Sequence, residues 1–187
     1  MPESALTPVE TPQDVLDFWF REVDKSDWFR GGAELDAKIA ARFADLHGRL
    51  SDEVPDSWLA SHEGVLAAII VLDQFSRNLF RGDARAFASD GDALNLAHLA
   101  IERVWDGDYP DDERQFLYMP FMHVEDTRGQ DRSVELFGLL DDDEPLRFAD
   151  KHRDVIARFG RFPGRNTALG RESTAAEQRY LDDGGGF

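Results

Sequence analysis

The feature that most constrains this fold is the segment Gly64–Arg81, in which nine residues without a polar side chain run into a cluster of charges and amides. Residues 64–72 are apolar on every helical face, and they are too few to span a bilayer. They therefore predict a helix surrounded by protein. The polar residues that follow keep helical spacing, with Asp73 and Arg77 four positions apart. Because a lone buried charge is costly, this helix end must form a satisfied polar network or line a polar pocket.

The composition is that of a globular chain, and 187 residues are expected to form one domain. Cysteine is absent, which excludes disulfides, thiolate zinc sites, iron–sulfur clusters and a cysteine nucleophile. The first residues lack the basic and apolar regions of a signal peptide, so we expect a cytoplasmic protein. The net charge of −17 argues against nucleic acid as a partner, and no segment predicts a membrane partner.

Apolar residues recur at helical spacing along most of the chain, and no window favours a strand. The predicted helices cover residues 13–20, 34–50, 64–81, 91–105, a segment from Asp111 or Asp112 through Phe121, 131–140, 145–159 and 174–181. Trp28 and Phe29 fall in a linker between the first two helices. We therefore predict an all-α fold of about eight helices.

The ends of the domain are predicted from capping signals. Thr11 followed by Pro12 starts the first helix, and Thr174 with Glu177 forms a capping box before the last one. The predicted domain is residues 11–181, preceded by a flexible arm at residues 1–10 and followed by a flexible tail at residues 182–187.

Four segments in order carry the pattern of a known family. They are Asp14–Phe20, Leu72–Gly82 with its Asp-Gln-Phe-Ser-Arg-Asn core, Pro120–Asp126, and Arg158–Arg171. With them the chain resembles the uncharacterised bacterial family called domain of unknown function 924, over roughly residues 11–181. The resemblance implies an all-helical, tetratricopeptide-like fold, in which helices stack as antiparallel pairs. It implies no established activity.

The chain departs from the pattern of that family at two positions. Gly164 stands where the family usually has the histidine of Pro-His-Arg-Asn, and Val124 stands where it has the serine of His-Ser-Glu. No role that needs this histidine or this hydroxyl is carried over. The chain also lacks a clean repeat of about 34 residues, so the superhelix that we predict is irregular.

The arginines of this acidic chain gather in two segments, and both contain phenylalanine, arginine and asparagine in close succession, at Phe75–Asn78 and Phe162–Asn166. Arginine forks grip carboxylates at two points, and asparagine can pair with an amide. We therefore predict a polar pocket for a small acidic or amide-bearing ligand, or for an acidic peptide end. Its ligand-binding residues would be Asp73, Gln74, Arg77, Asn78, Arg81, His123, Arg161, Arg165, Asn166 and Arg171.

A structural lattice is the alternative to this pocket, with Asp73, Asp83, Asp90 and Glu125 as counter-ions of the arginines. In the pocket version, the loop Gly160–Arg171 packs across the end of the buried helix. Two arginines of different segments, Arg77 and Arg165, then hold an anion between them.

A second hypothesis makes the chain an enzyme with His123 as general acid or base, oriented by Glu125 or Asp73. An enzyme requires a carboxylate within hydrogen-bond reach of His123 and an open cavity beside the ring. A binding module requires arginine forks that face a cavity without carboxylate partners. A third hypothesis is a scaffold that binds a partner helix through an apolar patch around Trp19, Trp28 or Trp58.

Other chemistry has little support in the sequence. The possible metal ligands His123, Glu125, Asp126 and His152 do not follow a recognised spacing, so we expect no metal and no other cofactor. Nucleophile-elbow and phosphate-loop motifs are absent. The identity of the ligand, the reaction and the oligomeric state stay open.

Overall fold

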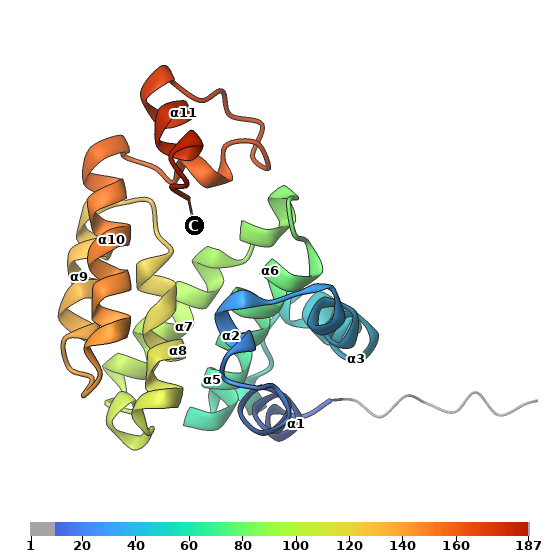
Figure 1. Cartoon of the computed structure of the whole chain (residues 1–187). Coiled ribbons are helices and arrows are strands. Elements are labelled where there is room, and N and C mark those ends of the chain that lie inside the picture. The colour runs from blue at the N-terminus through green and yellow to red at the C-terminus, as the bar shows by residue number, and fades with distance from the viewer. Residues whose placement is uncertain (1–9, 187) are drawn as a thin grey trace, which may run out of the picture.

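The computed structural model describes residues 10–186, which form helices and turns without any strand (Figure 1). Eight continuous helical stretches in these residues have seven or more members, which confirms the predicted all-α fold. The elements are α1 (Pro12–Asp17), η1 (Phe18–Glu22), α2 (Asp27–Arg30), α3 (Ala33–Asp52), α4 (Asp56–Leu59), α5 (His62–Ile69), η2 (Ile70–Phe75), α6 (Ser76–Leu79), η3 (Ala84–Phe87), α7 (Asp90–Glu102), η4 (Asp106–Asp108), α8 (Asp111–Met122), α9 (Thr127–Phe137), α10 (Asp143–Phe159), η5 (Pro163–Arg165) and α11 (Ala175–Asp182).

The predicted termini are described only in part. Residues 1–9 of the predicted arm lie outside the described residues, and Glu10 accepts a hydrogen bond from Arg42. The predicted tail is described as far as Gly186, with Asp182 still in α11. No helix in the described part of the chain combines the length and the apolarity needed to cross a membrane.

The predicted central helix is the continuous stretch formed by α5, η2 and α6. Every residue from Gly64 to Ser76 is buried, and Ile70 has no exposed surface. α5 packs against α1, α4, α7 and α8, while α3 covers η2 and α6. At the start of the helix a Cβ on Gly64 would lie 2.1 Å from the carbonyl oxygen of Trp58. Only glycine therefore allows the helix to approach α4 this closely.

The middle of this helix, η2, is a π-helical turn that the sequence did not predict. A π turn is wider than an α turn and often marks a functional site. Side chains donate to its carbonyl oxygens, from Ser76 Oγ to Leu72 at 2.6 Å and from Arg77 Nη1 to Asp73 at 2.7 Å. The widened turn thus holds Asp73 inside the core and surrounds its backbone with polar partners.

A second π turn, η1, lies directly against the first one. The ring of Phe75 in η2 meets the rings of Phe18 and Trp19 edge-on, at centroid distances of 5.9 and 5.7 Å. The carbonyl oxygen of Trp19 accepts a hydrogen bond of 2.9 Å from Trp28 Nε1. Trp28 belongs to the one-turn helix α2, so the segment that we predicted as a linker is helical here. The indole of Trp28 is buried.

The other side of the molecule is a layer of α8, α9 and α10, which pack against one another, and α7 joins this layer to α5 (Figure 1). The C-terminal segment with η5 and α11 covers one end of the fold, and a small second core forms where its Phe162 meets Val155 and Ile156 of α10. The tetratricopeptide-like superhelix implied by the resemblance stays a prediction.

The end of α7 carries the only non-glycine residue with positive φ among the described residues, Val104 at 57°. The amides of Val104 and Trp105 donate to the carbonyl oxygens of Ile101 and Ala100, which is the Schellman arrangement at a helix C-terminus. Glycine is the usual residue at this position, because a β-branched side chain is strained in the left-handed region.

We predict that Val104→Gly raises the free energy of unfolding by roughly 0.5–1 kcal/mol, since the relief of strain exceeds the entropic cost of the added glycine. Chemical denaturation measures the change. The control is Glu102→Gly at the end of the same helix, which should cost roughly 0.5–1 kcal/mol because its backbone is helical. A loss of stability in both variants would contradict the prediction.

Candidate functional site

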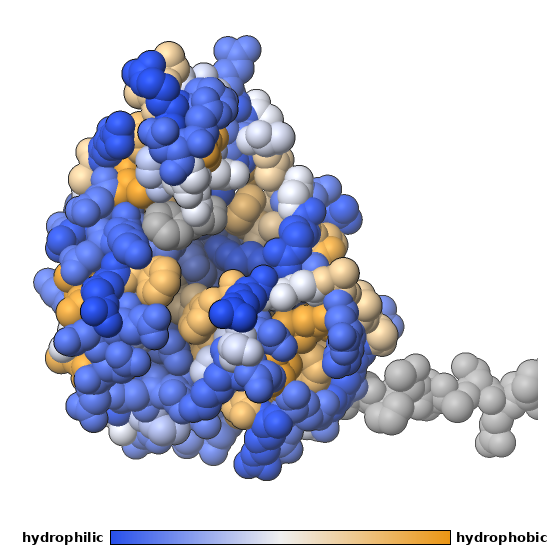
Figure 2. Space-filling model, viewed as in Figure 1, coloured by the Kyte–Doolittle hydropathy of each residue, from blue (hydrophilic) through white to orange (hydrophobic). Residues whose placement is uncertain are grey.

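A cavity of about 660 Å³ opens between α2, α8 and α10. Figure 2 shows a hollow at the centre of the face turned toward the viewer, flanked by hydrophobic residues. Its walls are mainly apolar and aromatic side chains, including Trp28, Phe29, Met119, Met122, Phe137, Leu140 and Phe148. Two histidines also line it, His123 at the C-terminal end of α8 and His152 on α10. A volume of this size suits a small organic ligand.

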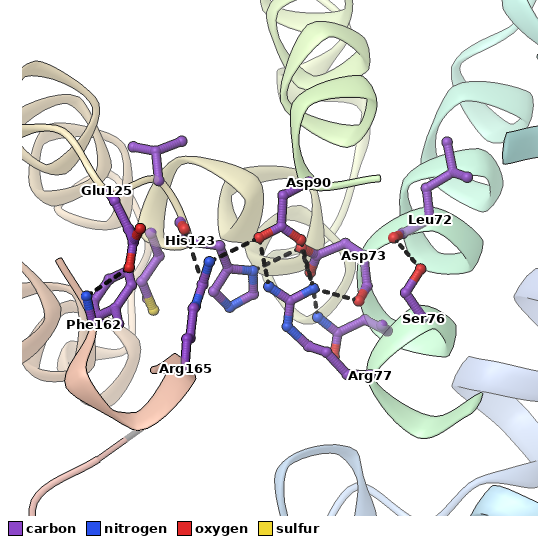
Figure 3. A network of polar contacts seen from close by, with 12 residues as sticks. Leu72, Asp73, Ser76, Arg77, Asp90, His123, Glu125, Phe162 and Arg165 are labelled. Atoms are coloured by element: carbon purple, nitrogen blue, oxygen red, sulfur yellow. Dashed lines mark hydrogen bonds and ion pairs between the residues drawn. The ribbon is translucent and has the colours of Figure 1, made fainter. Parts of the chain in front are cut away.

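His123 is held by the carboxylate of the π turn. Its Nδ1 lies 2.7 Å from Asp73 Oδ1, and Asp73 is 1% exposed and does not line the cavity (Figure 3). A carboxylate only accepts hydrogen bonds here, so Nδ1 carries the proton and Nε2 carries the lone pair. Nε2 makes no hydrogen bond within the described part of the chain. The free nitrogen of His123 is thus an acceptor at the wall of a cavity.

The charges around this pair keep the imidazole neutral. Burial lowers the pKa of His123, and the cation of Arg77 lowers it further against the opposing effect of Asp73. Burial alone would raise the pKa of Asp73, but Arg77 and His123 hold it well below its usual range. The pair is therefore an ionised carboxylate beside a neutral imidazole at neutral pH.

His152 is the second imidazole of the cavity, and its ring centroid lies 6.3 Å from that of His123. Its Nδ1 is 2.8 Å from the carbonyl oxygen of Phe148, so Nδ1 donates and Nε2 is the acceptor nitrogen of this ring as well. Burial lowers the pKa of His152 to about 3.

Arg77 and Arg165 come together as expected, but a carboxylate of the chain lies between them (Figure 3). Arg77 forms a two-point pair with Asp90, with bonds of 3.0 and 3.2 Å. Arg165 Nη1 donates to Asp90 Oδ2 at 3.0 Å, and its Nη2 donates to the carbonyl oxygen of His123 at 3.0 Å. Arg77 also pairs with Asp73 at 3.1 Å. Asp90 thus occupies the place where we expected a bound anion.

The guanidinium group of Arg165 is further fixed by two aromatic rings. It lies 4.6 Å from the ring centroid of Phe87 and 4.7 Å from that of Phe162. Cation–π contacts of this kind stabilise a desolvated arginine. Arg165 is therefore a structural tie between η3, α7, α8 and the C-terminal loop.

The remaining predicted ligand-binding residues also have partners inside the chain. Gln74 Nε2 donates to Asp73 Oδ2 at 2.6 Å. Asn78 and Arg81 both donate to Asp36, and Arg161 makes a two-point pair with Glu177. Arg171 makes a two-point pair with Glu125 and donates to Asn166, which itself donates to Ser173. The structure therefore brings Asp73, Gln74, Arg77, His123 and Arg165 into one network and leaves the others outside it.

The two carboxylates considered for orienting His123 have different roles. Asp73 contacts the ring, whereas Glu125 accepts the amide of Phe162 at 2.7 Å and pairs with Arg171. Glu125 thus anchors the loop that follows α10. Asp126, once considered as a metal ligand, is the N-cap of α9. Among the described residues no group of three or more histidines, aspartates and glutamates is placed to hold a metal ion.

A buried serine–histidine pair lies elsewhere in the core, with 2.7 Å between His47 Nε2 and Ser76 Oγ. Ser76 has no exposed surface, and its hydroxyl donates to the carbonyl oxygen of Leu72. A hydroxyl that donates to the backbone and meets no cavity is not available as a nucleophile. The pair joins α3 to the central helix.

The lattice alternative named Asp90 as a counter-ion, and Asp90 bridges two arginines at the start of α7. Sequence reasoning did not anticipate two other parts of this site. Trp28 and Phe29 were placed in a linker, and they form a wall of the cavity. His152 was considered only as a metal ligand. Their chemistry was visible in the sequence, but nothing local indicated that they would meet.

We predict that His152 makes the protein sensitive to mild acid. The unfolded chain takes up a proton near pH ~6.5, whereas the folded pKa of His152 is about 3, so stability falls by up to ~1.4 kcal/mol per unit as the pH drops between these two values. His152→Gln should flatten the decline between about pH 6 and 5 by roughly 1 kcal/mol per unit. Urea denaturation measures the slopes. Phe148→Leu, a change without a titratable group in the same wall, should keep the wild-type slope, and equal slopes in all three proteins would contradict the prediction.

Comparisons with known proteins agree with this fold. The family described as bacterial protein of unknown function (DUF924) matches residues 15–185. A solved structure, the protein of unknown function ATU0120 from Agrobacterium tumefaciens, is 40% identical with a TM-score of 0.87, and the match covers 92% of this chain and 97% of that one. No curated protein matches. The chain belongs to the DUF924 family of bacterial proteins.

Proposed function

We propose that this chain is an enzyme that takes a small, largely apolar substrate into the cavity and uses His123, oriented by Asp73, as its general base. The observation that carries the proposal is the pair itself: a buried carboxylate 2.7 Å from Nδ1, and an Nε2 that no described residue bonds, beside a cavity of about 660 Å³. A base whose ring is fixed by a third group is a recurrent catalytic arrangement.

Asp73 supports proton transfer to His123, against the opposing effects of burial and of Arg77. A neutral Nε2 can accept a proton from water or from a substrate, and the resulting imidazolium would lie directly against the carboxylate of Asp73. Asp73 in turn stays ionised because Arg77 lies beside it. Arg165 holds the backbone carbonyl of His123, so the base is fixed through both its side chain and its main chain.

We favour this proposal over the capture of an acidic ligand by the arginines. The five predicted arginines all have carboxylate partners, and none of them lines the cavity. A bound acid would have to displace Asp90 or another carboxylate of the chain. A cytoplasmic location remains part of the proposal and is consistent with the lack of cysteine.

We predict that diethyl pyrocarbonate, which acylates neutral imidazole, loses less of its rate at His123 between pH ~7.5 and ~5.5 than at N-acetylhistidine, which slows by roughly tenfold, because the pKa of His123 is lowered. Asp73→Asn should slow the modification, because an asparagine can donate to Nδ1 and shift the proton to Nε2. Peptide mass mapping follows each histidine. The matched control is Glu125→Gln, which removes the other carboxylate considered and should leave the rate at His123 unchanged. An unreactive His123, or equal effects of the two variants, would contradict the assignment.

Catalysis itself is tested by a parallel screen of wild type and His123→Gln against chromogenic esters, amides and lactones with alkyl or aromatic groups. We expect a hydrolytic activity that falls by 10²-fold or more in the variant, as on loss of a general base. His98→Gln changes an exposed histidine outside the cavity and serves as the control. An activity that survives in His123→Gln would remove His123 from the mechanism.

A further inference from the structure

Three ring N–H groups at the cavity, those of Trp28, His123 and His152, are already used inside the protein. Trp28 Nε1 donates to the carbonyl oxygen of Trp19 at 2.9 Å. The N–H of His123 is directed at Asp73, and that of His152 at the carbonyl oxygen of Phe148. His123 therefore presents an acceptor nitrogen to the cavity on its other side.

The charged groups at the cavity favour a cation in the same way. Four carboxylates line it (Asp111, Asp112, Asp142 and Glu144) against two cations (Lys25 and Arg30). Lys25 is paired with Asp112 and Arg114 with Asp111, which leaves Asp142 and Glu144 against Arg30 as the charges without an ion-pair partner in the described part of the chain. The chain as a whole carries a net charge of −17. An anion that reached His123 would meet an acceptor nitrogen instead of a donor, and only Arg30 among the lining cations is without a carboxylate partner in the described residues.

The aromatic walls already attract ammonium groups of the chain itself. Lys25 Nζ lies 5.6 Å from the ring centroid of Trp28, and Lys151 Nζ lies 4.9 Å from that of Phe148. Trp28 is on the α2 side of the cavity and Phe148 on the α10 side, and Phe29 and Phe148 are 64% and 44% exposed. Aromatic faces favour cations over anions.

We propose that the cavity selects an amine, a molecule with an aromatic or aliphatic body whose ammonium group donates a hydrogen bond to Nε2 of His123. The body of the ligand lies among the aromatic and methionine side chains of the cavity, and its ammonium group reaches His123. The carboxylate of Asp73 on the other side of the imidazole favours the charge of the ligand, and the cation of Arg77 opposes it. This inference rests on the proposed function only in taking the cavity as the ligand site.

The test uses three probes that share a phenethyl body and differ in head group: 2-phenylethylamine, 2-phenylethanol and 3-phenylpropanoate. Isothermal titration at low ionic strength measures their binding. We expect the amine to bind with a dissociation constant at or below about 1 mM, and at least tenfold more tightly than the alcohol, with the carboxylate weakest. His123→Gln should weaken the amine by about tenfold, because one charge-assisted hydrogen bond is lost or weakened. His98→Gln, outside the cavity, should bind like wild type.

Each other outcome overturns the inference in a different way. Tightest binding of the carboxylate would show that the site is basic and would support an acidic ligand. Equal binding of amine and alcohol would remove the selectivity for a cation and leave His123 as an acceptor. Absence of binding by all three, or amine binding that is unchanged in His123→Gln, would show that His123 does not receive an amine. The modification of His123 by diethyl pyrocarbonate is a separate measurement. It tests the proposed general base independently of which of the three probes binds.

Discussion

The burial of Asp73 is the constraint on which the rest of this structure depends. An ionised carboxylate inside a core costs several kcal/mol unless charges and hydrogen bonds compensate it. Asp73 is compensated by Arg77, His123 and Gln74, at 3.1, 2.7 and 2.6 Å. Arg77 is largely buried as well and needs Asp90, and Asp90 is shared with Arg165. One buried charge in the π turn thus connects the central helix to α7, α8 and the C-terminal loop.

This series of charge pairs explains the arginine-rich loop after α10. The loop has little regular structure, so its backbone depends on side-chain anchors. Arg165 is held by Asp90 and two aromatic rings, Arg171 by Glu125, and Arg161 by Glu177. Arginine suits this task because its planar fork makes two-point pairs that fix orientation as well as position. The lattice interpretation therefore accounts for these arginines without a ligand.

His123 is the residue at which this lattice meets the cavity. Its carbonyl oxygen and Nδ1 belong to the network, and its ring also lines the space between α2, α8 and α10. A purely structural histidine would have no need of a cavity beside it, whereas a base requires both the fixed ring and the open side. The π turn that carries Asp73 fits this interpretation, because such turns re-aim side chains at functional sites.

The all-α fold, the buried helix and the helix caps could be predicted from the sequence because each depends on neighbours a few positions away. The run Gly64–Leu72 indicates burial by itself, and Thr11 and Thr174 cap their helices through residues three positions on. Asp73 and Arg77 were recognised as candidates because charges at the end of a buried helix require partners, and His123 was recognised as a possible general acid or base.

Only the tertiary structure decided which partners these residues have. His123 and Asp73 are 50 positions apart, and Arg165 and Asp90 are 75 positions apart, so no local pattern connects them. Each arginine had several carboxylates of the chain as possible partners, and the tertiary packing determines which pairs form. The two π turns and the cavity wall formed by α2 likewise follow from how Phe75, Trp19 and Trp28 pack. Periodicity reports which face of a helix is buried, but not what lies against it, and the function of a site depends on what lies against it.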